Sequence, residues 1–326
     1  MNFAIIGCGL IGQKRARALH AAGHRVGIAA DTIPERAEKL AAAYGAAATN
    51  EWQLAAQSND VDAVIVATTN QWLAPVSAAA AEAGKHVIVE KPAARSAAEL
   101  DTVSAAARRT GVKVQVGFNH RYHPALQKAR QVIDSGALGT LMFLRGRYGH
   151  GGRVGYEKEW RADPALSGGG ELIDQGVHLI DLSRWFLGDF SRIEGRAATY
   201  FWNMPVDDNA FMMLSTGGGQ IAWLQVSCTE WKNMFSLEIY GRDGKLDIQG
   251  LGGSYGVERI AFYRMLPQMG PPETTIWEFP GEDRSWALEM ADFEESIRTG
   301  VSRGPTLEDA KAALEIVDCI YEKSKT

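Results

Sequence analysis

Residues 3–12, FAIIGCGLIG, decide the fold of this chain. The apolar run at 3–7 leads directly into the glycine pattern GCGLIG at 7–12 and then into a segment with helical spacing. In a GxGxxG turn the first glycine permits the tight turn, the second lets backbone approach a pyrophosphate, and the third allows close packing of helix on strand. The amides at the start of the following helix then face the anion. The pattern therefore predicts a dinucleotide site formed by Gly7, Gly9, Leu10, Ile11 and Gly12.

The same theme of apolar run and helix continues to about residue 119. Alanine-rich segments with helical spacing, such as 34–44, 75–83 and 96–109, separate five short apolar runs. The runs are too short for helices and too continuously apolar for half-exposed strands, so we expect buried parallel strands. They occupy residues 3–7, 26–30, 63–67, 86–90 and 114–118. This alternation predicts an α/β fold with a doubly wound parallel sheet, and we assign residues 1–119 to a Rossmann domain that binds NAD(P).

After residue 120 the sequence pattern changes, and we assign residues 120–326 to an α+β domain for substrate binding and oligomerisation. Period-two alternation of apolar residues predicts an open, mainly antiparallel mixed sheet. Seven of the nine tryptophans lie beyond residue 159, which favours a homodimer or homotetramer formed through this sheet. We expect the C-terminal helix to pack back on the first domain. The expected helices are 124–135, 171–187, 285–298 and 307–323, and the clearest strands are 220–228 and 235–240.

Composition limits the possible functions. The 326 residues carry 34 Lys and Arg against 39 Asp and Glu, a net charge of −5 that gives no footprint for nucleic acid. Cys8, Cys228 and Cys319 are far apart and form no CxxC pair, so we expect reduced thiols and no metal. No apolar run is long enough to span a membrane and no leader pattern precedes residue 3, so we expect a cytoplasmic protein without a membrane partner.

Asp31 lies nineteen residues after Gly12, at the end of the second predicted strand. A carboxylate at this place accepts hydrogen bonds from the adenosine ribose and repels a 2′-phosphate. The carboxylate therefore favours NAD as the cofactor. NADP remains an alternative, because Arg36 could approach its 2′-phosphate.

Two segments carry candidate catalytic groups. Lys91, in Glu90-Lys91-Pro92, follows a strand at the carboxyl edge of the sheet, where ligands bind in such folds. Its ammonium could polarise a substrate oxygen, although a solvated lysine after a strand is the alternative interpretation. The second segment, GGGELIDQGVHLID at 168–181, places Asp174 and His178 on one helical face together with Asp181. An imidazole is a suitable base for an alcohol proton, and a hydrogen-bonded core histidine is the alternative.

A basic and aromatic stretch at 145–161 precedes the glycine triplet. Its arginines suit an anionic sugar and its aromatic rings suit sugar stacking, so it could form a mobile lid over the pocket. A solvated charged loop is an equally good interpretation. The stretch contains Arg145, Arg147, Tyr148, His150, Arg153, Tyr156, Lys158, Trp160 and Arg161.

Four motifs together resemble the glucose-fructose oxidoreductase / inositol dehydrogenase (Gfo/Idh/MocA) family. They are AIIGCGLIG at 4–12, AGKHVIVEKP at 83–92, GFNHRYHPA at 117–125 and GGGELIDQGVHLIDLSRWFLG at 168–188. The resemblance implies that Lys91, Asp174 and His178 are the catalytic trio and that Asp31 binds the adenosine ribose. One segment departs from the family pattern: Thr68-Thr69 replaces a threonine-proline pair and Leu73 stands where a histidine is common. We interpret this as altered packing at the cofactor edge.

The resemblance completes the expected site. Further cofactor contacts are expected at Thr68, Asn70, Glu90, Lys91 and Asn119. Substrate contacts are expected at Lys91, Arg121, Tyr148, Trp160, Arg161, Asp174 and His178.

The predicted function is NAD(P)-dependent hydride transfer between nicotinamide and a secondary alcohol or ketone of a sugar, inositol or nucleotide sugar. One alternative is a glycoside hydrolase or epimerase that recycles its NAD without net redox change. The other is a non-catalytic NAD(P)-binding sensor.

Overall fold

The computed structural model describes residues 1–325, which form two compact units. Unit 1 consists of Met1–Asn119, Ala165–Gly168 and Trp286–Glu315. Unit 2 consists of His120–Pro164, Gly169–Ser285 and the chain from Ile316 on. None of the helices in residues 1–325 combines the length and the apolar character that crossing a bilayer requires.

Unit 1 is built on a six-stranded parallel sheet in the order β3-β2-β1-β4-β5-β6. The strand order reverses between β1 and β4, and ligands of such sheets bind at the carboxyl ends of the strands beside that reversal. The strands are β1 (Asn2–Ile6), β2 (Arg25–Ala30), β3 (Ala47–Thr49), β4 (Ala63–Val66), β5 (His86–Glu90) and β6 (Val114–Gly117). The predicted doubly wound sheet is confirmed, with one strand more than the five apolar runs indicated, because β3 is only three residues long and contains two alanines.

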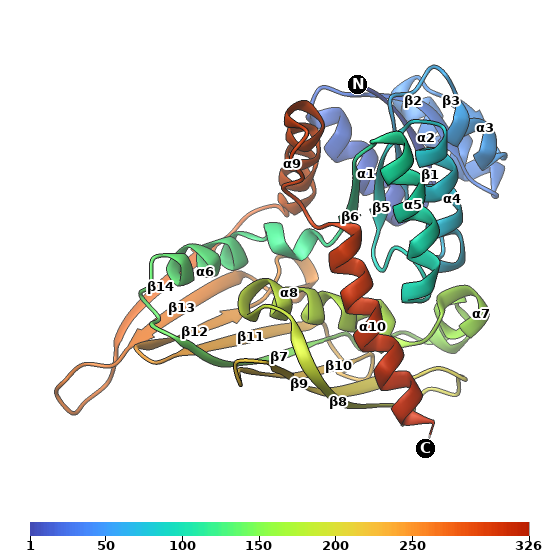
Figure 1. The fold of residues 1–326 in the computed structure, drawn as a ribbon. Coiled ribbons are helices and arrows are strands. Elements are labelled where there is room, and N and C mark those ends of the chain that lie inside the picture. The colour runs from blue at the N-terminus through green and yellow to red at the C-terminus, as the bar shows by residue number, and fades with distance from the viewer. Residues whose placement is uncertain (326) are drawn as a thin grey trace. The chain divides into compact units, whose positions relative to one another are not determined.

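Helices lie on both sides of this sheet, with α1 and α9 on one side and α4 and α5 on the other (Figure 1). They are α1 (Leu10–Ala21), α2 (Pro34–Tyr44), α3 (Trp52–Gln57), α4 (Asn70–Glu82), η1 (Ala97–Glu99), α5 (Leu100–Thr110) and α9 (Ser285–Thr299). The expected start of α4 at residue 75 is wrong. The helix begins at Asn70 and includes Pro75 in its second turn, where the proline ring removes one backbone hydrogen bond of the helix.

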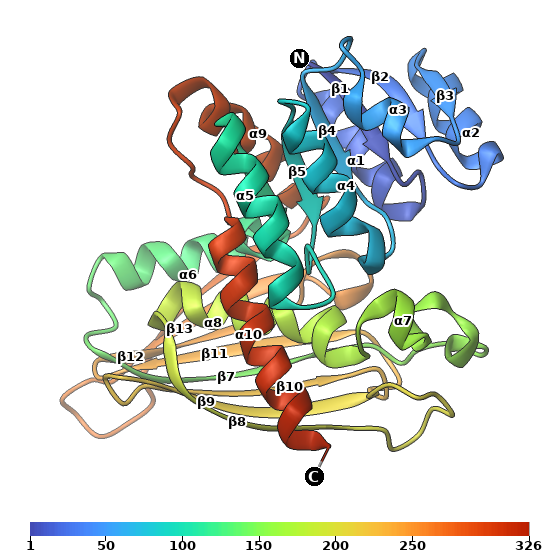
Figure 2. The ribbon, with the colours of Figure 1, turned by 45° about the vertical axis from the view of Figure 1, so that its right-hand side comes forward.

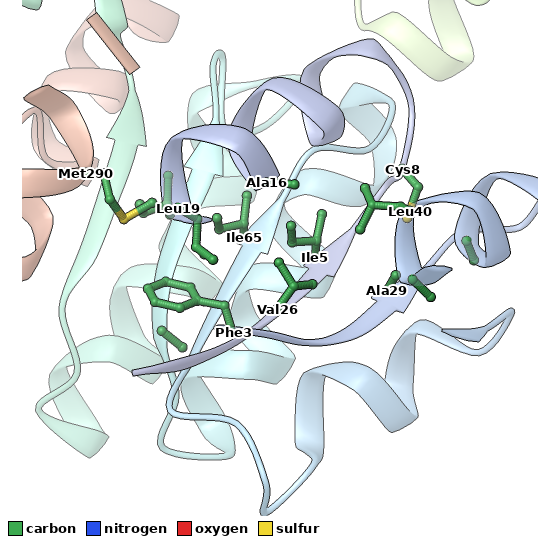
Figure 3. Packing of buried hydrophobic residues seen from close by; sticks show 14 of the residues in the cluster. Phe3, Ile5, Cys8, Ala16, Leu19, Val26, Ala29, Leu40, Ile65 and Met290 are labelled. Atoms are coloured by element: carbon green, nitrogen blue, oxygen red, sulfur yellow. The ribbon is translucent and has the colours of Figure 1, made fainter. Parts of the chain in front are cut away.

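The core of unit 1 joins β1, β4 and the two helices on one side of the sheet. Figure 3 shows Phe3 and Ile5 of β1 beside Ile65 of β4, with Leu19 of α1 and Met290 of α9 packed against them. All five side chains are fully buried, and each such side chain contributes roughly 1.5–3 kcal/mol relative to an exposed one. This packing joins β1 and β4 to the helices on one side of the sheet.

Unit 2 is built on an eight-stranded mixed sheet in the order β14-β13-β12-β11-β7-β10-β9-β8. Only β7 and β10 pair in parallel, and the other neighbours are antiparallel. The strands are β7 (Leu141–Gly149), β8 (Phe190–Ala198), β9 (Asn209–Thr216), β10 (Ile221–Ser227), β11 (Met234–Gly241), β12 (Gly244–Gln249), β13 (Glu258–Arg264) and β14 (Glu273–Phe279). The predicted open, mainly antiparallel sheet is confirmed.

Helices cover one face of this sheet, on which α6 and α8 lie (Figure 1 and Figure 2). The burial of β10 alternates accordingly: Leu224 and Val226 are buried, whereas Trp223 is 60% exposed. The remaining helical elements are η2 (Asn119–Tyr122), α6 (Pro124–Asp134), η3 (Tyr156–Lys158), η4 (Trp160–Ala162), α7 (Pro164–Ser167), η5 (Leu172–Gly176), α8 (Val177–Leu187), η6 (Gly253–Tyr255) and α10 (Leu307–Ser324).

The expected single helix at 171–187 is wrong in its first part. Residues Leu172–Gly176 form a π-helical turn, η5, and the α-helix starts only at Val177. Single π turns of this kind are rare in proteins, and those that occur frequently lie at functional sites.

Candidate active site

The glycine turn of unit 1 has the geometry that a dinucleotide needs. Gly7 has φ +94°, and a side chain there would collide with the carbonyl oxygen of Ala67. A side chain at Gly12 would collide with the carbonyl oxygen of Gly7. A Cβ at Gly9, in contrast, would meet no atom within 4 Å, and Gly9 is the N-cap of α1 without a side-chain cap. The turn is therefore tightly packed on two sides and open where a pyrophosphate approaches the helix N-terminus, flanked by Leu10 and Ile11 in the first helical turn.

Asp31 is fixed beside this turn. Its Oδ2 accepts a hydrogen bond from the Cys8 amide (2.7 Å) and its Oδ1 accepts one from the Ile33 amide (2.9 Å). Burial, together with the nearby Asp31 charge, raises the pKa of the Cys8 thiol to about 12, so Cys8 stays protonated. Arg36 is exposed on α2. The carboxylate position agrees with ribose recognition in Rossmann domains.

Lys91 follows β5 directly, and its neighbour Glu90 belongs to a buried ionic cluster. Glu90 Oε1 accepts a hydrogen bond from Arg15 Nε (2.6 Å), and Arg15 Nη1 donates to Glu289 of α9. Arg15 is fully buried, and its guanidinium also lies 4.5 Å from the ring centre of Trp286. Because the cluster joins α1, β5 and α9, it fixes the end of the strand from which Lys91 extends. Sequence reasoning missed Arg15 and Glu289, and nothing in their spacing signals the pair.

The remaining expected cofactor residues lie at the ends of β4 and β6. Thr68 follows β4, and its hydroxyl donates to the Thr69 carbonyl oxygen (3.1 Å). Asn70 is buried and donates from Nδ2 to the Ser167 carbonyl oxygen (2.8 Å). Asn119 is buried at the start of η2, just after β6. Asn70 thus holds the segment that precedes the glycine triplet, a role that the sequence did not indicate.

In unit 2, Asp174 lies in the π-helical turn and His178 in the first turn of α8. His178 is buried, and the side chain of Asp174 is 14% exposed. Asp181 was expected on the same face, but its carboxylate is fully buried and accepts two hydrogen bonds from Arg121, at 2.8 Å from Nε and 2.5 Å from Nη2. Asp181 and Arg121 therefore form a bidentate ion pair in which the carboxylate is buried.

Aromatic and imidazole rings surround His178. The His120 ring stacks on His178 with ring centres 3.7 Å apart, and Tyr148 meets His178 edge-on at 6.1 Å. The Tyr255 ring lies 5.5 Å from Tyr148, and burial raises the pKa values of both phenols. His120 belongs to the GFNHRYHPA motif, but the motif alone did not indicate that its ring stacks on His178. Tyr255 could not be found from the sequence, because it lies 77 positions after His178 in a glycine-rich turn.

The basic stretch at 145–161 is ion-paired with carboxylates. Arg161 Nε donates to Asp174 Oδ2 (3.0 Å), and the Asp174 charge raises the pKa of Arg161. The Arg161 guanidinium also lies 4.6 Å from the ring centre of Trp160. The other pairs are Arg145 with Glu238, Arg147 with Glu230 and Arg153 with Glu159. The expectation that the whole stretch is a loop is wrong, because residues up to Gly149 form β7 in the middle of the sheet.

His150 follows β7 and lies near the start of the π turn, with Nε2 3.6 Å from Glu171 Oε1. Burial lowers its pKa, so a neutral imidazole is favoured at pH 7. Within residues 1–325, no group of three or more His, Cys, Asp or Glu side chains is arranged to hold a metal ion.

These groups can perform proton transfer to or from an alcohol. An imidazole and a carboxylate stand in adjacent helical turns, and an arginine holds the carboxylate in place. Unit 1 supplies an open glycine turn, a fixed carboxylate for a ribose and a lysine at the carboxyl edge of its sheet.

Comparison with known proteins agrees with this geometry. Residues 1–118 match an oxidoreductase family with an NAD-binding Rossmann fold, and residues 126–247 match the GFO/IDH/MocA C-terminal domain. The chain is 29% identical to inositol 2-dehydrogenase 2 of Saccharopolyspora erythraea, over 98% of this chain and 92% of that protein. It is 26% identical to levoglucosan dehydrogenase of Pseudarthrobacter phenanthrenivorans, over 91% of this chain and 87% of that protein.

A solved structure of levoglucosan dehydrogenase in complex with NADH and levoglucosan has the same fold. The TM-score is 0.89 at 26% identity, covering 100% of this chain and 97% of that one. The chain therefore belongs to the Gfo/Idh/MocA family of oxidoreductases, with an N-terminal NAD-binding Rossmann fold.

Proposed function

We propose that this protein is an NAD-dependent dehydrogenase that oxidises a secondary alcohol on an uncharged sugar or cyclitol ring, and that it also catalyses the reverse reduction. Residues 1–119 bind the dinucleotide, and residues 120–326 bind the substrate and form the oligomer. The observation that carries the proposal is the buried His178 beside the turn that holds Asp174, in a chain whose glycine turn is open at Gly9. The names of the similar proteins, which act on levoglucosan and inositol, support the substrate class.

Each member of the trio has a distinct task. His178 accepts the hydroxyl proton at an imidazole nitrogen, and Lys91 stabilises the negative charge that develops on the substrate oxygen. Asp174, held by Arg161, orients His178 and the substrate hydroxyl. Bound NAD supplies the hydride acceptor.

Charge pairing favours an uncharged substrate over the anionic one that the arginines alone suggested. Every arginine at 145–161 is paired with a carboxylate, so little net positive charge remains to bind a phosphate or carboxylate. We assign substrate contacts to Tyr148, Trp160 and Arg161, with Arg121 acting through Asp181.

The cofactor preference follows from Asp31. Its carboxylate is held next to the glycine turn by the Cys8 amide, where it accepts hydrogen bonds from a ribose and repels a 2′-phosphate. We therefore propose NAD over NADP. The remaining cofactor contacts are assigned to Gly7, Gly9, Leu10, Ile11, Gly12, Arg36, Thr68, Asn70, Glu90, Lys91 and Asn119.

We further propose a homo-oligomer formed through the uncovered face of the eight-stranded sheet. Trp223 and Met213 are directly opposite on β10 and β9 and are 60% and 42% exposed, and Phe211 on the same face is 41% exposed. Exposed apolar side chains gathered on one sheet face are typical of a subunit interface.

The test is a 340 nm assay of the purified protein with NAD or NADP against inositols, anhydrosugars, free sugars, sugar acids and nucleotide sugars, with mass analysis of each mixture. His178→Ala and Lys91→Met should each reduce turnover strongly and leave NADH binding nearly unchanged. His20→Ala and Lys39→Met, at exposed helix positions, are the matched controls.

The outcomes separate the function classes. Reduction of NAD with a neutral polyol supports the proposal, whereas product without net NADH formation identifies a cofactor-recycling enzyme. NADH binding without turnover of any compound identifies a sensor. Near-normal turnover in either active-site variant would show that the assigned role is wrong.

A further inference from the structure

Three successive backbone amides at the start of the π-helical turn donate to one residue, Asp207. The Gly170 amide donates to Asp207 Oδ1 (2.9 Å) and the Leu172 amide to Oδ2 (2.8 Å). The Glu171 amide between them donates to the Asp207 backbone carbonyl oxygen (2.9 Å). The first amides of a helical segment have no acceptor within the helix, so Asp207, from the connection between β8 and β9, supplies the acceptors from outside.

Tyr321 of α10 completes this arrangement. Its hydroxyl donates to Asp207 Oδ1 (2.8 Å) and also accepts a hydrogen bond from the Gly170 amide (3.1 Å). Burial raises the pKa of Asp207, and the bonds from Leu172 and Tyr321 oppose that rise. Tyr321 therefore helps to keep a deeply buried carboxylate able to accept hydrogen bonds.

The glycine triplet fits closely against these two residues. A side chain at Gly169 would collide with the Tyr321 hydroxyl, and one at Gly170 would collide with the Asp207 carbonyl oxygen. The Asp174 amide in turn donates to the Gly170 carbonyl oxygen (3.1 Å). The position of Asp174 is thus linked through a single turn to Asp207 and Tyr321.

We propose that Asp207 and Tyr321 are positioning residues, which set the orientation of Asp174 and His178 by holding the amides of residues 170–172. The inference rests on the proposed function, because it assigns these residues to the alcohol oxidation carried by Asp174 and His178. It adds the last helix of the chain to the elements that build the site.

A purely structural role and a positioning role predict different kinetics. If the two residues only stabilise the fold, Tyr321→Phe lowers the midpoint of unfolding and leaves kcat of the folded enzyme unchanged. If they position Asp174, the variant loses transition-state stabilisation, and kcat and kcat/KM fall together. Loss of a supporting hydrogen bond, or a displacement of about 1 Å, reduces activity about tenfold to a hundredfold.

The experiment compares Tyr321→Phe with Ser324→Ala on the same helix. The Ser324 hydroxyl accepts a hydrogen bond from the Ala197 amide (2.9 Å), away from the π-helical turn. Ser324→Ala is therefore a control that also removes one hydroxyl group. Tyr321→Phe should lower kcat about tenfold to a hundredfold, change KM less than about threefold and leave the Kd of NADH unchanged. Amide exchange in residues 169–178 should become faster in Tyr321→Phe and not in Ser324→Ala.

Two further variants keep the result interpretable. Asp174→Asn is measured in the same series: if it retains full turnover, the role that the proposed function gives to Asp174 is wrong, and if the wild type itself oxidises no polyol, the proposed function is wrong. If Asp174→Asn loses turnover while Tyr321→Phe keeps wild-type kcat, the positioning role is wrong. Asp207→Asn removes the carboxylate charge at nearly unchanged shape and should reproduce the fall in kcat. If Tyr321→Phe does not fold, a wild-type kcat in Asp207→Asn overturns the inference on its own.

Discussion

Replacing Arg15 by methionine should destabilise unit 1 strongly. Arg15 and Glu289 have no exposed side-chain surface, and the side chain of Glu90 is 10% exposed. Methionine keeps most of the length of the side chain but leaves two carboxylates buried without their cation. Breaking a buried ion pair by removing one partner costs about 3–5 kcal/mol.

This free energy translates into a measurable shift in Tm. At about 2–4 °C per kcal/mol for a unit of this size, the Tm of the variant should fall by about 6–20 °C. The effect should also depend on pH. Removing the guanidinium leaves the negative charge of the buried cluster uncompensated, which favours proton uptake by the folded variant. The stability of the variant relative to the wild type should therefore improve as the pH is lowered from 8 to about 5.

The assay is urea unfolding and thermal melting of Arg15→Met at several pH values, followed by fluorescence, with Arg17→Met as the control. Arg17 lies two positions further along α1 and is exposed, so its replacement should change the free energy of unfolding by less than about 0.5 kcal/mol. Adding Glu289→Gln to Arg15→Met should recover part of the loss, because one of the two stranded charges is removed. Equal midpoints for Arg15→Met and Arg17→Met would refute the reasoning, as would a deficit that grows at low pH.

Three other predictions concern the cofactor, the oligomer and a loop. Asp31→Ala should raise the KM for NAD about tenfold to a hundredfold, because a charge-assisted hydrogen bond of about 1.5–3 kcal/mol is lost. It should also bring NADP use closer to NAD use, because the repulsion of a 2′-phosphate is relieved. Unchanged cofactor selectivity in steady-state assays would contradict the role of Asp31. Trp223→Lys should lower the mass measured by light scattering to that of a smaller assembly. Trp72→Lys, at an exposed tryptophan of unit 1, should leave the mass unchanged. If the Trp223 variant keeps its wild-type mass, the subunit interface lies elsewhere. Burial alone would raise the pKa of Asp208, but hydrogen bonds from Asn209 and from the Phe201, Trp202 and Tyr200 amides lower the pKa overall. The ionised Asp208 therefore stabilises the fold above about pH 4, and this stabilisation is lost as the pH falls through the lowered pKa. Asp208→Asn should therefore be less stable than the wild type at pH 7, with a smaller difference in acid-unfolding curves below about pH 3, and a constant difference across that range would argue against it.

The elements that the sequence predicted well are those specified by local patterns. The glycine turn at 7–12 is a local pattern, because its three glycines lie within six residues and the collision at Gly12 is with the carbonyl oxygen of Gly7 in the same turn. The alternation in β10 was predictable in the same way, since Ala222, Leu224 and Val226 face the buried side as expected. A three-residue strand such as β3 carries too few apolar residues to be distinguished from a loop.

The parts that the sequence could not predict depend on contacts between distant positions. The π turn at Leu172–Gly176 is held by Asp207 and Tyr321, which lie 35 and 149 positions after Leu172. The stacking of His120 on His178 joins residues from η2 and α8, and no spacing rule connects them. The arginines at 145–161 were visible in the sequence, but their carboxylate partners on β11 and in the turn before it were not.

The π-helical turn also makes the site sensitive to the length of the chain. A π turn contains one residue more than the α-helical turn that would replace it, so deleting Gln175, which lies between Asp174 and His178, allows a regular α-helix to form. Each residue of an α-helix corresponds to about 100° of rotation around its axis. Such a deletion would turn Asp174 away from its present direction while His178 stays in place. A gap of one residue here in a related sequence would thus mark a protein that has kept the fold and rearranged its chemistry.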